Sequence, residues 1–516
     1  MPGDASGAAP QVELGGALSL DEVVAVAEGA PARLGEGAAE RIAASRAAIE
    51  RAVESGEVVY GVTTGFGSLA EVRLSKEHAS ALQHGLIRTH AVAVGRELPP
   101  AEVRAMLALR AHVLGLGHSG VRFEVANRFV ELLDHGILPV VPEQGSLGAS
   151  GDLAPLAHLA LGAVGEGEVT VGGERSRASE ALASAGLRPL ELEAKEGLAL
   201  INGTQGMTAI GVLAAARSRQ LAKTADVAAA LTIEAILGTD RAFDLRVVGL
   251  RPHPGQQAAA RNLLRLLAGS EILASHRESH HIVQDAYSIR CAPQVHGAFR
   301  DVLANTIRTL EIELASVSDN PIVTDDGAIL SCGNFHGQPV AHACDSLAAA
   351  AVGLASISER RLYRLLDPKT SNGLPPFLVG EAGVNSGFMV CQYTAASLVS
   401  ESKSLAHPAT VDSITSSAGQ EDHVSMGMIA ARHARDCVAN AEVVVALELL
   451  AAGQACELRA PRLPAAGGRA ALRALRRAVP PLEHDRELKP DVDAAIDLVR
   501  SGAVVAAVES EIGALE

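Results

Sequence analysis

Residues 441–452 read Ala-Glu-Val-Val-Val-Ala-Leu-Glu-Leu-Leu-Ala-Ala and form the middle of an aliphatic window that runs from 426 to 458. Ala and Leu favour helix, and such windows hold no proline and few glycines, since most glycines of the chain lie outside them. Long antiparallel helices with short joints make a bundle, so the sequence predicts a mainly α fold built on long helices. The other windows of this kind are 207–237, 297–317, 340–366 and 388–405.

Shorter elements are expected in the N-terminal part of the chain. Ser19 and Glu22 have the spacing of a capping box, so a helix should begin there. Further helices are expected at 37–54, 100–113 and 123–135, and strand-like runs at 58–62 and 167–174. We therefore expect a smaller, α-rich N-terminal domain over 1–200. The remainder, 201–516, should form the central bundle with a C-terminal helical cap.

Composition sets broad limits on the class of protein. The chain has 516 residues, of which 60 are acidic and 44 basic, for a net charge of −16. Its length suits two or three domains or one large helical body, and its 48% hydrophobic content argues against bulk disorder. With eight Phe, four Tyr and no Trp, the core must be aliphatic. The acidic balance argues against a general nucleic-acid binder, which needs clustered Lys and Arg.

The cysteines and the N-terminus bear on the compartment. The six cysteines are far apart and include no CxxC pair, which favours reduced thiols in a cytoplasmic protein over disulfides or a zinc site. The first residues lack the basic region and apolar stretch of a signal peptide. Residues 197–216 are uncharged, but the polar run 202–206 interrupts them, so we expect a buried helix entry and no membrane span.

Several short motifs fail when their context is considered. The run 115–120 matches GxGxxG but follows a helix, which does not fit a dinucleotide fingerprint. Asp152 stands where a nucleophile elbow around Ser150 needs glycine. A possible metal pair lacks the HExxH pattern and a nearby cysteine pair; its histidines would come from His276, His280 and His281. Nucleotide binding, serine hydrolysis and metal binding are therefore disfavoured.

The most informative stretch runs from Gly145 to His158 and reads Gly-Ser-Leu-Gly-Ala-Ser-Gly-Asp-Leu-Ala-Pro-Leu-Ala-His. It describes a crowded turn with a flexible backbone, followed by a helix. If the chain bends sharply here, the amide nitrogen of Gly151 approaches the carbonyl carbon of Ala149. Glycine is needed at 151 because a side chain would block that bend.

This stretch resembles the signature of the histidine and aromatic amino acid ammonia-lyases, in which an Ala-Ser-Gly triplet loses two waters and becomes a 4-methylidene-imidazol-5-one group (MIO). The resemblance implies that Ala149, Ser150 and Gly151 form MIO, with no dissociable cofactor and no metal. It extends in ordered blocks from about residue 13 to about residue 500. The other blocks are Tyr60–Gly67, Leu82–His90, Leu200–Gln205, Val283–Arg290, Ser318–Pro321, Gly333–His336, Asp412–Ser413 and Gln420–Met426.

The resemblance also implies roles for residues in these blocks. Tyr60 would remove the substrate's β-proton, and Arg290 would hold its carboxylate. Taken singly, Tyr60 could equally be a core tyrosine and Arg290 a structural helix cap. The expected catalytic residues are Tyr60, Ala149, Ser150, Gly151, Asn202 and Tyr287. The expected substrate-binding residues are His90, Gln284, Arg290, Phe335 and Glu421.

His90 and Glu421 indicate the substrate within the family. A buried imidazole needs partners for two ring nitrogens, because an unpaired buried polar group costs roughly 1–3 kcal/mol. His90 is polar where tyrosine lyases usually carry Leu, and Glu421 is a carboxylate where phenylalanine lyases typically carry an amide. The resemblance thus implies an enzyme that eliminates ammonia from L-histidine to give trans-urocanate, the first step of histidine degradation. Two alternatives are a phenylalanine or tyrosine ammonia-lyase or 2,3-aminomutase on the same scaffold, and a non-catalytic helical scaffold.

Assembly and partners are also implied by the resemblance. It points to the fumarase/aspartase-like helical superfamily and to a homotetramer whose active sites draw residues from more than one subunit. The partner is a small molecule, L-histidine, and neither nucleic acid nor membrane is expected. Mild departures from the family concern loop geometry: Thr63 replaces an Asn of some relatives, Ala286 replaces a Pro, and 413–415 lack a Leu-Pro pair.

Overall fold

The computed structural model describes residues 11–65, 76–279 and 283–516. Contacts divide the chain into two units, each assembled from three separate segments. The first unit comprises Met1–Leu213, Ile307–Cys344 and Pro408–Arg432, and the second comprises Ala214–Thr306, Asp345–His407 and His433–Glu516. The two sequential domains expected from the sequence, 1–200 and 201–516, remain a prediction.

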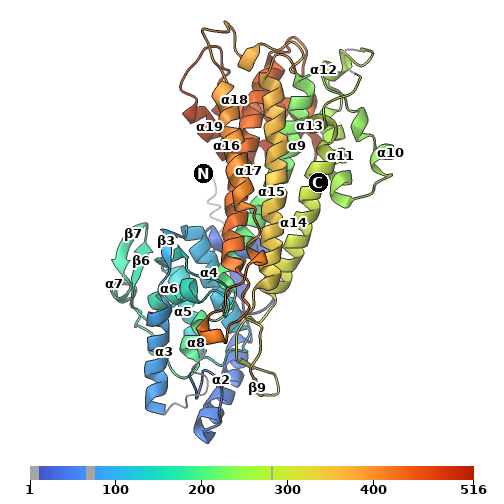
Figure 1. The fold of residues 1–516 in the computed structure, drawn as a ribbon. Coiled ribbons are helices and arrows are strands. Elements are labelled where there is room, and N and C mark those ends of the chain that lie inside the picture. Colours follow the sequence, from blue (N-terminus) through green and yellow to red (C-terminus); the bar gives the residue numbers. More distant parts are fainter. Residues whose placement is uncertain (1–10, 66–75, 280–282) are drawn as a thin grey trace, which may run out of the picture. The chain divides into compact units, whose positions relative to one another are not determined.

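The first unit is organised around α4 (Pro100–Gly115), which is buried along nearly its whole length. Helices α1 (Leu20–Ala27), α2 (Ala38–Ser55) and α5 (Phe123–Asp134) pack against α4, and Figure 1 shows this group in blue and cyan. The predicted capping box at Ser19 is present at the start of α1. The remaining helices of this region are α3 (Lys76–His90), α6 (Leu153–Ala163), α7 (Ala178–Ser184) and α8 (Glu196–Ile201).

Among the described residues, the short strands of the first unit form three two-stranded sheets and one three-stranded sheet. Strand β4 (Ile137–Pro139) pairs antiparallel with β6 (Glu168–Val171), which pairs with β7 (Glu174–Arg177), so the strand expected at 167–174 is confirmed as part of a hairpin. The other pairs are β1 (Val12–Leu14) with β2 (Ala32–Leu34), parallel, and β3 (Val94–Glu97) with β5 (Pro142–Gln144) and β8 (Ile322–Val323) with β9 (Ile329–Leu330), both antiparallel.

The strand-like run at 58–62 was a wrong expectation, because the segment forms a turn. The amide of Val62 donates to the carbonyl of Val59 at 3.2 Å, and the amide of Val59 donates to Thr63 Oγ1 at 2.8 Å. Val59 and Val62 are buried in one apolar cluster with Ile49 of α2. Their apolar character reflects that cluster and not a place in a sheet.

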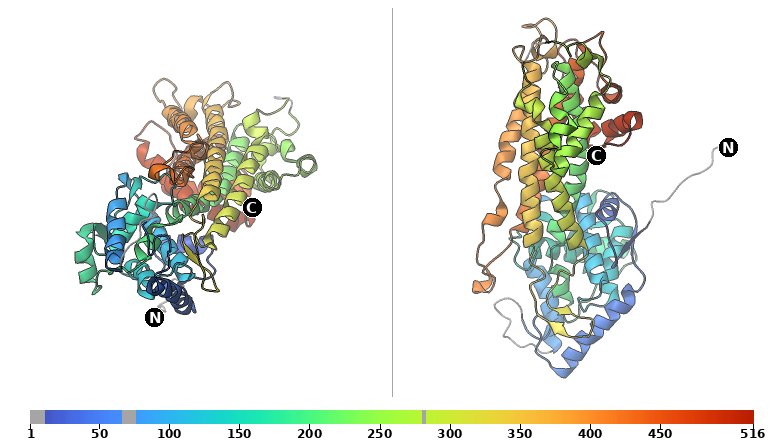
Figure 2. Two further views of the ribbon diagram at one scale, coloured as in Figure 1. Left: turned by 60° about the horizontal axis from the view of Figure 1, so that its bottom comes forward. Right: turned by 90° about the vertical axis from the view of Figure 1, so that its right-hand side faces the viewer.

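The long helices end within a few residues of the aliphatic windows, which confirms the mainly α fold. They are α9 (Gln205–Ala235), α14 (Ala292–Leu314), α15 (Gln338–Leu366), α16 (Met389–Leu405) and α17 (Gly427–Glu457). In the second unit α14 and α15 run side by side (Figures 1 and 2). The buried carboxylate of Glu448 in α17 accepts from Thr232 Oγ1 of α9 at 2.8 Å and from Arg361 Nε of α15 at 2.5 Å. One charged group therefore ties three helices together.

Shorter helices complete the second unit. Helix α18 (Ala466–Ala478) packs against α20 (Ala503–Ile512) and α11 (Pro254–Leu267), and α19 (Lys489–Arg500) contacts both α18 and α20. The C-terminal cap expected for the chain stays a prediction. The other short elements described are α10 (Leu245–Val248), α12 (Glu271–Ala274), α13 (Tyr287–Arg290), η2 (Arg241–Phe243), η3 (Pro376–Leu378), η4 (Ala409–Val411) and η5 (Ser417–Gly419), the last two in the first unit.

Two expectations from composition can be compared with the structure. All six cysteines are free. The uncharged run 197–216 falls in α8 and the start of α9 and is almost entirely buried. Within the described residues, α15 is the one helix long and apolar enough to cross a membrane, and 61% of its apolar window is buried, as in a core helix.

Candidate active site

The Ala149-Ser150-Gly151 triplet occupies a sharp bend between β5 and α6. Ser150 has a φ of 51° and Gly151 a φ of 81°, both in the left-handed region that L side chains rarely adopt. The bend is closed by a bridge between Gly148 and Gly151, whose amide donates to the Gly148 carbonyl at 3.4 Å. The chain therefore folds back on itself at the triplet, as ring closure would require.

The segment Asn202-Gly203 clamps this bend from the end of α8. The amide of Gly203 donates to the carbonyl of Ser150 at 3.1 Å, and the amide of Asp152 donates to the carbonyl of Gly203 at 2.7 Å. A Cβ atom at position 151 would overlap the carbonyl oxygen of Gly203. Only glycine fits there, so the residues present suit the formation of MIO from this triplet.

The Asp152 side chain fixes the loop through hydrogen bonds to Ser146 and Met207. This side chain is fully buried, and Oδ2 accepts from the amide of Met207 at 2.8 Å while Oδ1 accepts from Ser146 Oγ at 3.2 Å. Burial raises the pKa of the Asp152 carboxyl to about 7, although these hydrogen bonds oppose that rise. The carboxyl thus links the start of α6 to the first turn of α9.

The block 420–426 packs over the triplet. Ala149, Val424 and Met426 share an apolar cluster, and the amide of Met426 donates to the carbonyl of Leu147 at 3.0 Å. The amide of Val424 also donates to Ser413 Oγ at 3.1 Å. Two blocks that the family resemblance singled out separately, 412–413 and 420–426, therefore meet beside the loop.

His90 and Glu421 both belong to the first unit, and the charge of Glu421 acts on the His90 imidazole. His90 is the last residue of α3, and its Nδ1 is bonded to the Leu86 carbonyl at 2.8 Å. Burial lowers the pKa of the His90 imidazole, while the Leu86 carbonyl and the negative charge of Glu421 act in the opposite direction. Glu421 accepts from Ser416 Oγ at 2.7 Å. Both residues expected to contact the substrate side chain therefore belong to the first unit, and their place in a substrate site stays a prediction.

Three other expected residues of the first unit lie in loops or at a helix end. Tyr60 is half-buried in the turn that follows α2, and Phe335 is half-buried in the turn before α15. Asn202 follows α8, forms part of the clamp and is buried. Within the block Tyr60–Gly67, residues 66 and 67 lie outside the described part of the chain.

Sequence reasoning gave no role to the buried polar residues around Asn202. Asn202 Nδ2 donates to Asp319 Oδ1 at 3.1 Å and to the carbonyl of Asn320 at 2.9 Å. Lys195 Nζ lies 3.0 and 2.9 Å from the two oxygens of Asp319, and both side chains are fully buried. The block 318–321 was a signal that this loop matters, but nothing in the sequence pointed to Lys195.

The block Val283–Arg290 belongs to the second unit. The guanidinium carbon of Arg290 lies 4.6 Å from the centre of the Tyr287 ring, which is a cation–π contact. Asp285 is buried and accepts from the amide of Thr239 at 2.9 Å. This bond ties the block to the residues that follow α9.

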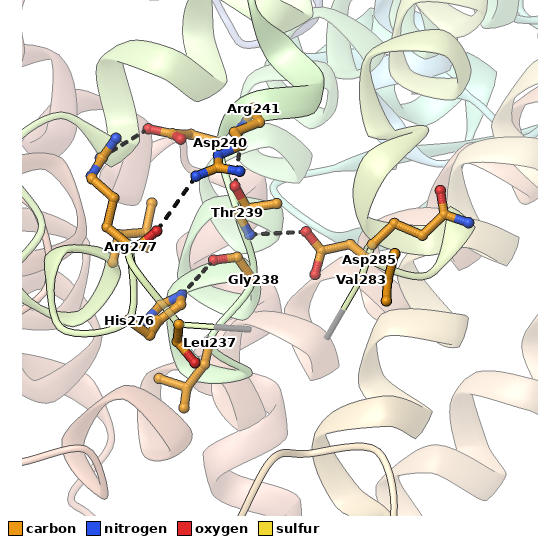
Figure 3. Close-up of a pocket in the computed structure, with 12 residues that line it drawn as sticks. Leu237, Gly238, Thr239, Asp240, Arg241, His276, Arg277, Val283 and Asp285 are labelled. Atoms are coloured by element: carbon orange, nitrogen blue, oxygen red, sulfur yellow. Dashed lines mark hydrogen bonds and ion pairs between the residues drawn. The ribbon is translucent and has the colours of Figure 1, made fainter. Parts of the chain in front are cut away.

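A hollow of about 100 Å³ adjoins that block (Figure 3). Val283 and Gln284 line it together with Asp240 and Arg277, whose side chains form an ion pair at 3.4 Å. His276 also lines it, and its two ring nitrogens are bonded to the carbonyls of Ile272 and Gly238 at 2.9 and 2.8 Å. His276 is thus engaged by backbone, while His280 and His281 lie outside the described residues. In the part of the chain that the structure describes, no cluster of three metal-ligating side chains occurs.

Comparison with known proteins places this fold and loop in one class of enzymes, the aromatic amino acid lyases. The family model for "Aromatic amino acid lyase" matches residues 18–477. The chain is 54% identical to a protein of Symbiobacterium thermophilum and 52% identical to one of Sorangium cellulosum, both named histidine ammonia-lyase. The alignments cover 98% and 97% of this chain and 99% of each relative. The chain belongs to the aromatic amino acid lyase family, which confirms the resemblance inferred from the sequence.

Solved structures agree with this assignment. The histidine ammonia-lyase of Trypanosoma cruzi superposes with a TM-score of 0.90 at 42% identity, covering 98% of this chain and 96% of that one. The tyrosine aminomutase of Streptomyces globisporus superposes with a TM-score of 0.92 at 38% identity, covering 98% and 100%. Proteins with this fold thus include a histidine ammonia-lyase and a tyrosine aminomutase, so the fold alone does not identify the substrate.

Proposed function

We propose that this protein is a histidine ammonia-lyase that converts L-histidine to trans-urocanate and ammonia, the first step of histidine degradation. The observation that carries the proposal is the bent Ala149-Ser150-Gly151 triplet clamped by Gly203, because it presents the backbone that MIO formation needs. The names of the relatives at 54% and 52% identity support histidine over the aromatic alternatives.

The chemical difficulty is a weakly acidic β-proton and a poor leaving group. Ala149, Ser150 and Gly151 would form MIO, which would supply an electrophilic carbon that makes the amino group of the substrate a better leaving group. Tyr60 accepts the β-proton as general base. The C–H electron pair becomes the new carbon–carbon double bond while the carbon–nitrogen bond breaks and ammonia departs.

Binding residues hold the substrate for this elimination. Arg290 pairs with the carboxylate through its planar guanidinium. Asn202 and Tyr287 orient the amine.

The imidazole ring of the substrate is held by His90 and Glu421, with Gln284 and Phe335 lining its surroundings. The lowered pKa of His90 favours a neutral ring, which has one donor and one acceptor nitrogen. Glu421 supplies a carboxylate that accepts from a substrate N–H, a contact a phenyl ring cannot make.

The proposal extends to assembly and compartment. We propose a cytoplasmic homotetramer whose active sites draw residues from more than one subunit, with L-histidine as its small-molecule partner and with neither nucleic acid nor membrane involved. The family resemblance supports this arrangement. Gel filtration with light scattering tests the oligomer, since a monomeric active enzyme would contradict it.

The experiment for the activity is Ser150→Ala. Alanine has no hydroxyl to eliminate, so the variant should fold but lose urocanate formation, and the peptide 145–158 should keep the mass of its unmodified sequence. In the unaltered protein that peptide should be lighter by two waters. Urocanate from histidine is compared with cinnamate from phenylalanine, coumarate from tyrosine, and the β-amino acids of an aminomutase. Full activity of the Ser150→Ala protein would refute the mechanism.

A further inference from the structure

In the Asn202 carboxamide, the nitrogen Nδ2 is hydrogen-bonded, whereas the oxygen Oδ1 has no hydrogen-bond partner among the described residues. Nδ2 donates to Asp319 Oδ1 and to the Asn320 carbonyl at 3.1 and 2.9 Å, and Oδ1 is buried. Buried polar atoms are normally paired, so an orphaned acceptor calls for an explanation. A ligand that brings a donor would supply one.

The orientation of that amide is dictated by its neighbours. An ionised carboxylate and a peptide carbonyl only accept hydrogen bonds, so both must face Nδ2 and not Oδ1. Lys195 Nζ contacts both oxygens of Asp319 with both side chains fully buried, which holds the Asp319 side chain in place. The amide of Asn320 also donates to Asp319 Oδ1 at 2.7 Å. Asp319 is thereby held from several sides.

The backbone of Asn202 is fixed as well. Arg110 Nη1 donates to the Asn202 carbonyl at 2.8 Å and to Gln205 Oε1 at 2.7 Å. Gln205 Nε2 in turn donates to Ser318 Oγ at 2.7 Å, one residue before Asp319. Side chain and main chain of Asn202 are therefore tied to the same loop, 318–320.

We propose that the buried pair Lys195–Asp319 is a positioning device that turns the Asn202 amide so that its oxygen accepts a hydrogen bond from the ammonium group of the substrate. This inference deepens the proposed function and rests on it. An ammonium has three donors and no acceptor, so it complements the free Oδ1 and would be repelled by a flipped amide. Lys195 and Asp319 act through Asn202 and touch no reacting atom.

The test compares unaltered protein with Asp319→Asn. An amide at 319 turns an NH₂ donor toward Lys195 Nζ in either orientation, because Nζ contacts both oxygen positions, so the side chain that orients Asn202 should be displaced. We expect kcat/KM for L-histidine to fall roughly 10- to 100-fold, as for other small misplacements of a binding group. The inhibition constant of imidazolepropionate, which is histidine without its amine, should stay about the same. The peptide 145–158 should still be lighter by two waters.

A matched control removes a buried carboxylate elsewhere. Glu442 in the second unit accepts from Arg217 Nε and Arg500 Nε, each at 2.9 Å. Glu442→Gln should lower the melting temperature but leave kcat/KM unchanged. Should Asp319→Asn fail to fold, Asp319→Glu keeps the charge opposite Lys195, shifts the carboxylate by one methylene, and carries the same expectations.

Each result of these measurements either supports or contradicts the positioning role of Lys195 and Asp319. An unchanged kcat/KM, equal weakening of histidine and imidazolepropionate, or loss of the two-water mass change would overturn the positioning role. If the unaltered protein itself forms no urocanate from histidine, the proposed function fails and the inference falls with it. If the unaltered protein forms urocanate and Asp319→Asn does so equally well, the inference alone fails.

Discussion

Oδ2 of Asp152 accepts a hydrogen bond from the amide of Met207 at 2.8 Å, so one fully buried carboxyl joins the start of α6 to the first turn of α9. This carboxyl lies directly after the Ala-Ser-Gly triplet. Its ionisation therefore affects both the stability of the first unit and the setting of the loop.

Stability should fall as pH rises through the range in which Asp152 ionises. The pKa of this carboxyl is about 7 in the folded protein against an ordinary value of 3.8, so the folded state binds more protons than the unfolded state between these values. The free energy of unfolding therefore decreases from about pH 4 to about pH 7. Asp152→Asn, which cannot ionise, should show a flatter profile in urea unfolding between pH 4 and 8.

Glu234 offers the control for that measurement. Burial raises the pKa of this carboxyl of the second unit to about 7 as well, and its Oε1 accepts from the amide of Ala465 at 2.7 Å. Glu234→Gln should flatten the profile by its own share, and the double variant by the sum, since distant sites add. Identical pH profiles for Asp152→Asn and the unaltered protein would contradict the role given to Asp152.

Gly151→Ala should abolish maturation of the triplet. The φ of 81° costs a non-glycine residue about 1–2 kcal/mol, and the overlap with the Gly203 carbonyl adds about 1–3 kcal/mol. Mass spectrometry should find the peptide 145–158 unmodified and urocanate formation lost. Gly172→Ala is the matched control, because its φ is 60° and no atom lies within 4 Å of the added Cβ. A mature, active Gly151→Ala protein would show that the clamp does not restrict this position.

Glu421→Gln should act on both His90 and the substrate. The negative charge of Glu421 favours the protonated imidazole, so its removal should lower the pKa of His90 further, as measured by NMR titration of the ring. Loss of a charged hydrogen bond to the substrate imidazole, about 1.5–3 kcal/mol, should reduce kcat/KM for histidine about 10- to 100-fold. The exposed neighbour Asp422 is the control, and Asp422→Asn should leave both quantities unchanged. An unchanged pKa of His90 in Glu421→Gln would show that the charge of Glu421 does not act on the His90 imidazole.

Arg290→Lys should raise KM for histidine about 10-fold or more. Lysine keeps the charge but loses the two-pronged geometry for a carboxylate and the flat stacking on Tyr287, where the guanidinium carbon lies 4.6 Å from the ring centre. Steady-state kinetics give the split between KM and kcat. Arg277→Lys, at an exposed ion pair beside the hollow near Gln284, should leave KM unaffected. An unchanged KM in Arg290→Lys would remove Arg290 from carboxylate binding.

The long helices could be predicted because their signal is local. The window 426–458 became α17 at 427–457, and the capping box of Ser19 and Glu22 formed as expected, since both depend on residues close in sequence. The run 58–62 misled because burial in a small cluster and pairing in a sheet select the same apolar residues. Apolar content alone does not separate them.

The site was predictable only where the family blocks were recognisable. The triplet, Asn202, His90 and Glu421 fall in such blocks, and the negative charge of Glu421 acts on the His90 imidazole. Lys195 was missed because a lysine beside Glu196 looks like an ordinary surface charge. Lys195 is buried against Asp319, which lies far away in the sequence. Its backbone also has a φ of 75°, which the local sequence does not predict.

The clamp between Ser150 and Gly203 has a consequence for biosynthesis. The two residues that hold the bend belong to segments separated by all of α6, β6, β7, α7 and α8. A nascent chain that has not yet released Gly203 from the ribosome carries the triplet without the partner that shapes it. If the triplet matures to MIO as proposed, its maturation would depend on the folding of the first unit, and the two-water mass loss of peptide 145–158 would report that this fold was reached.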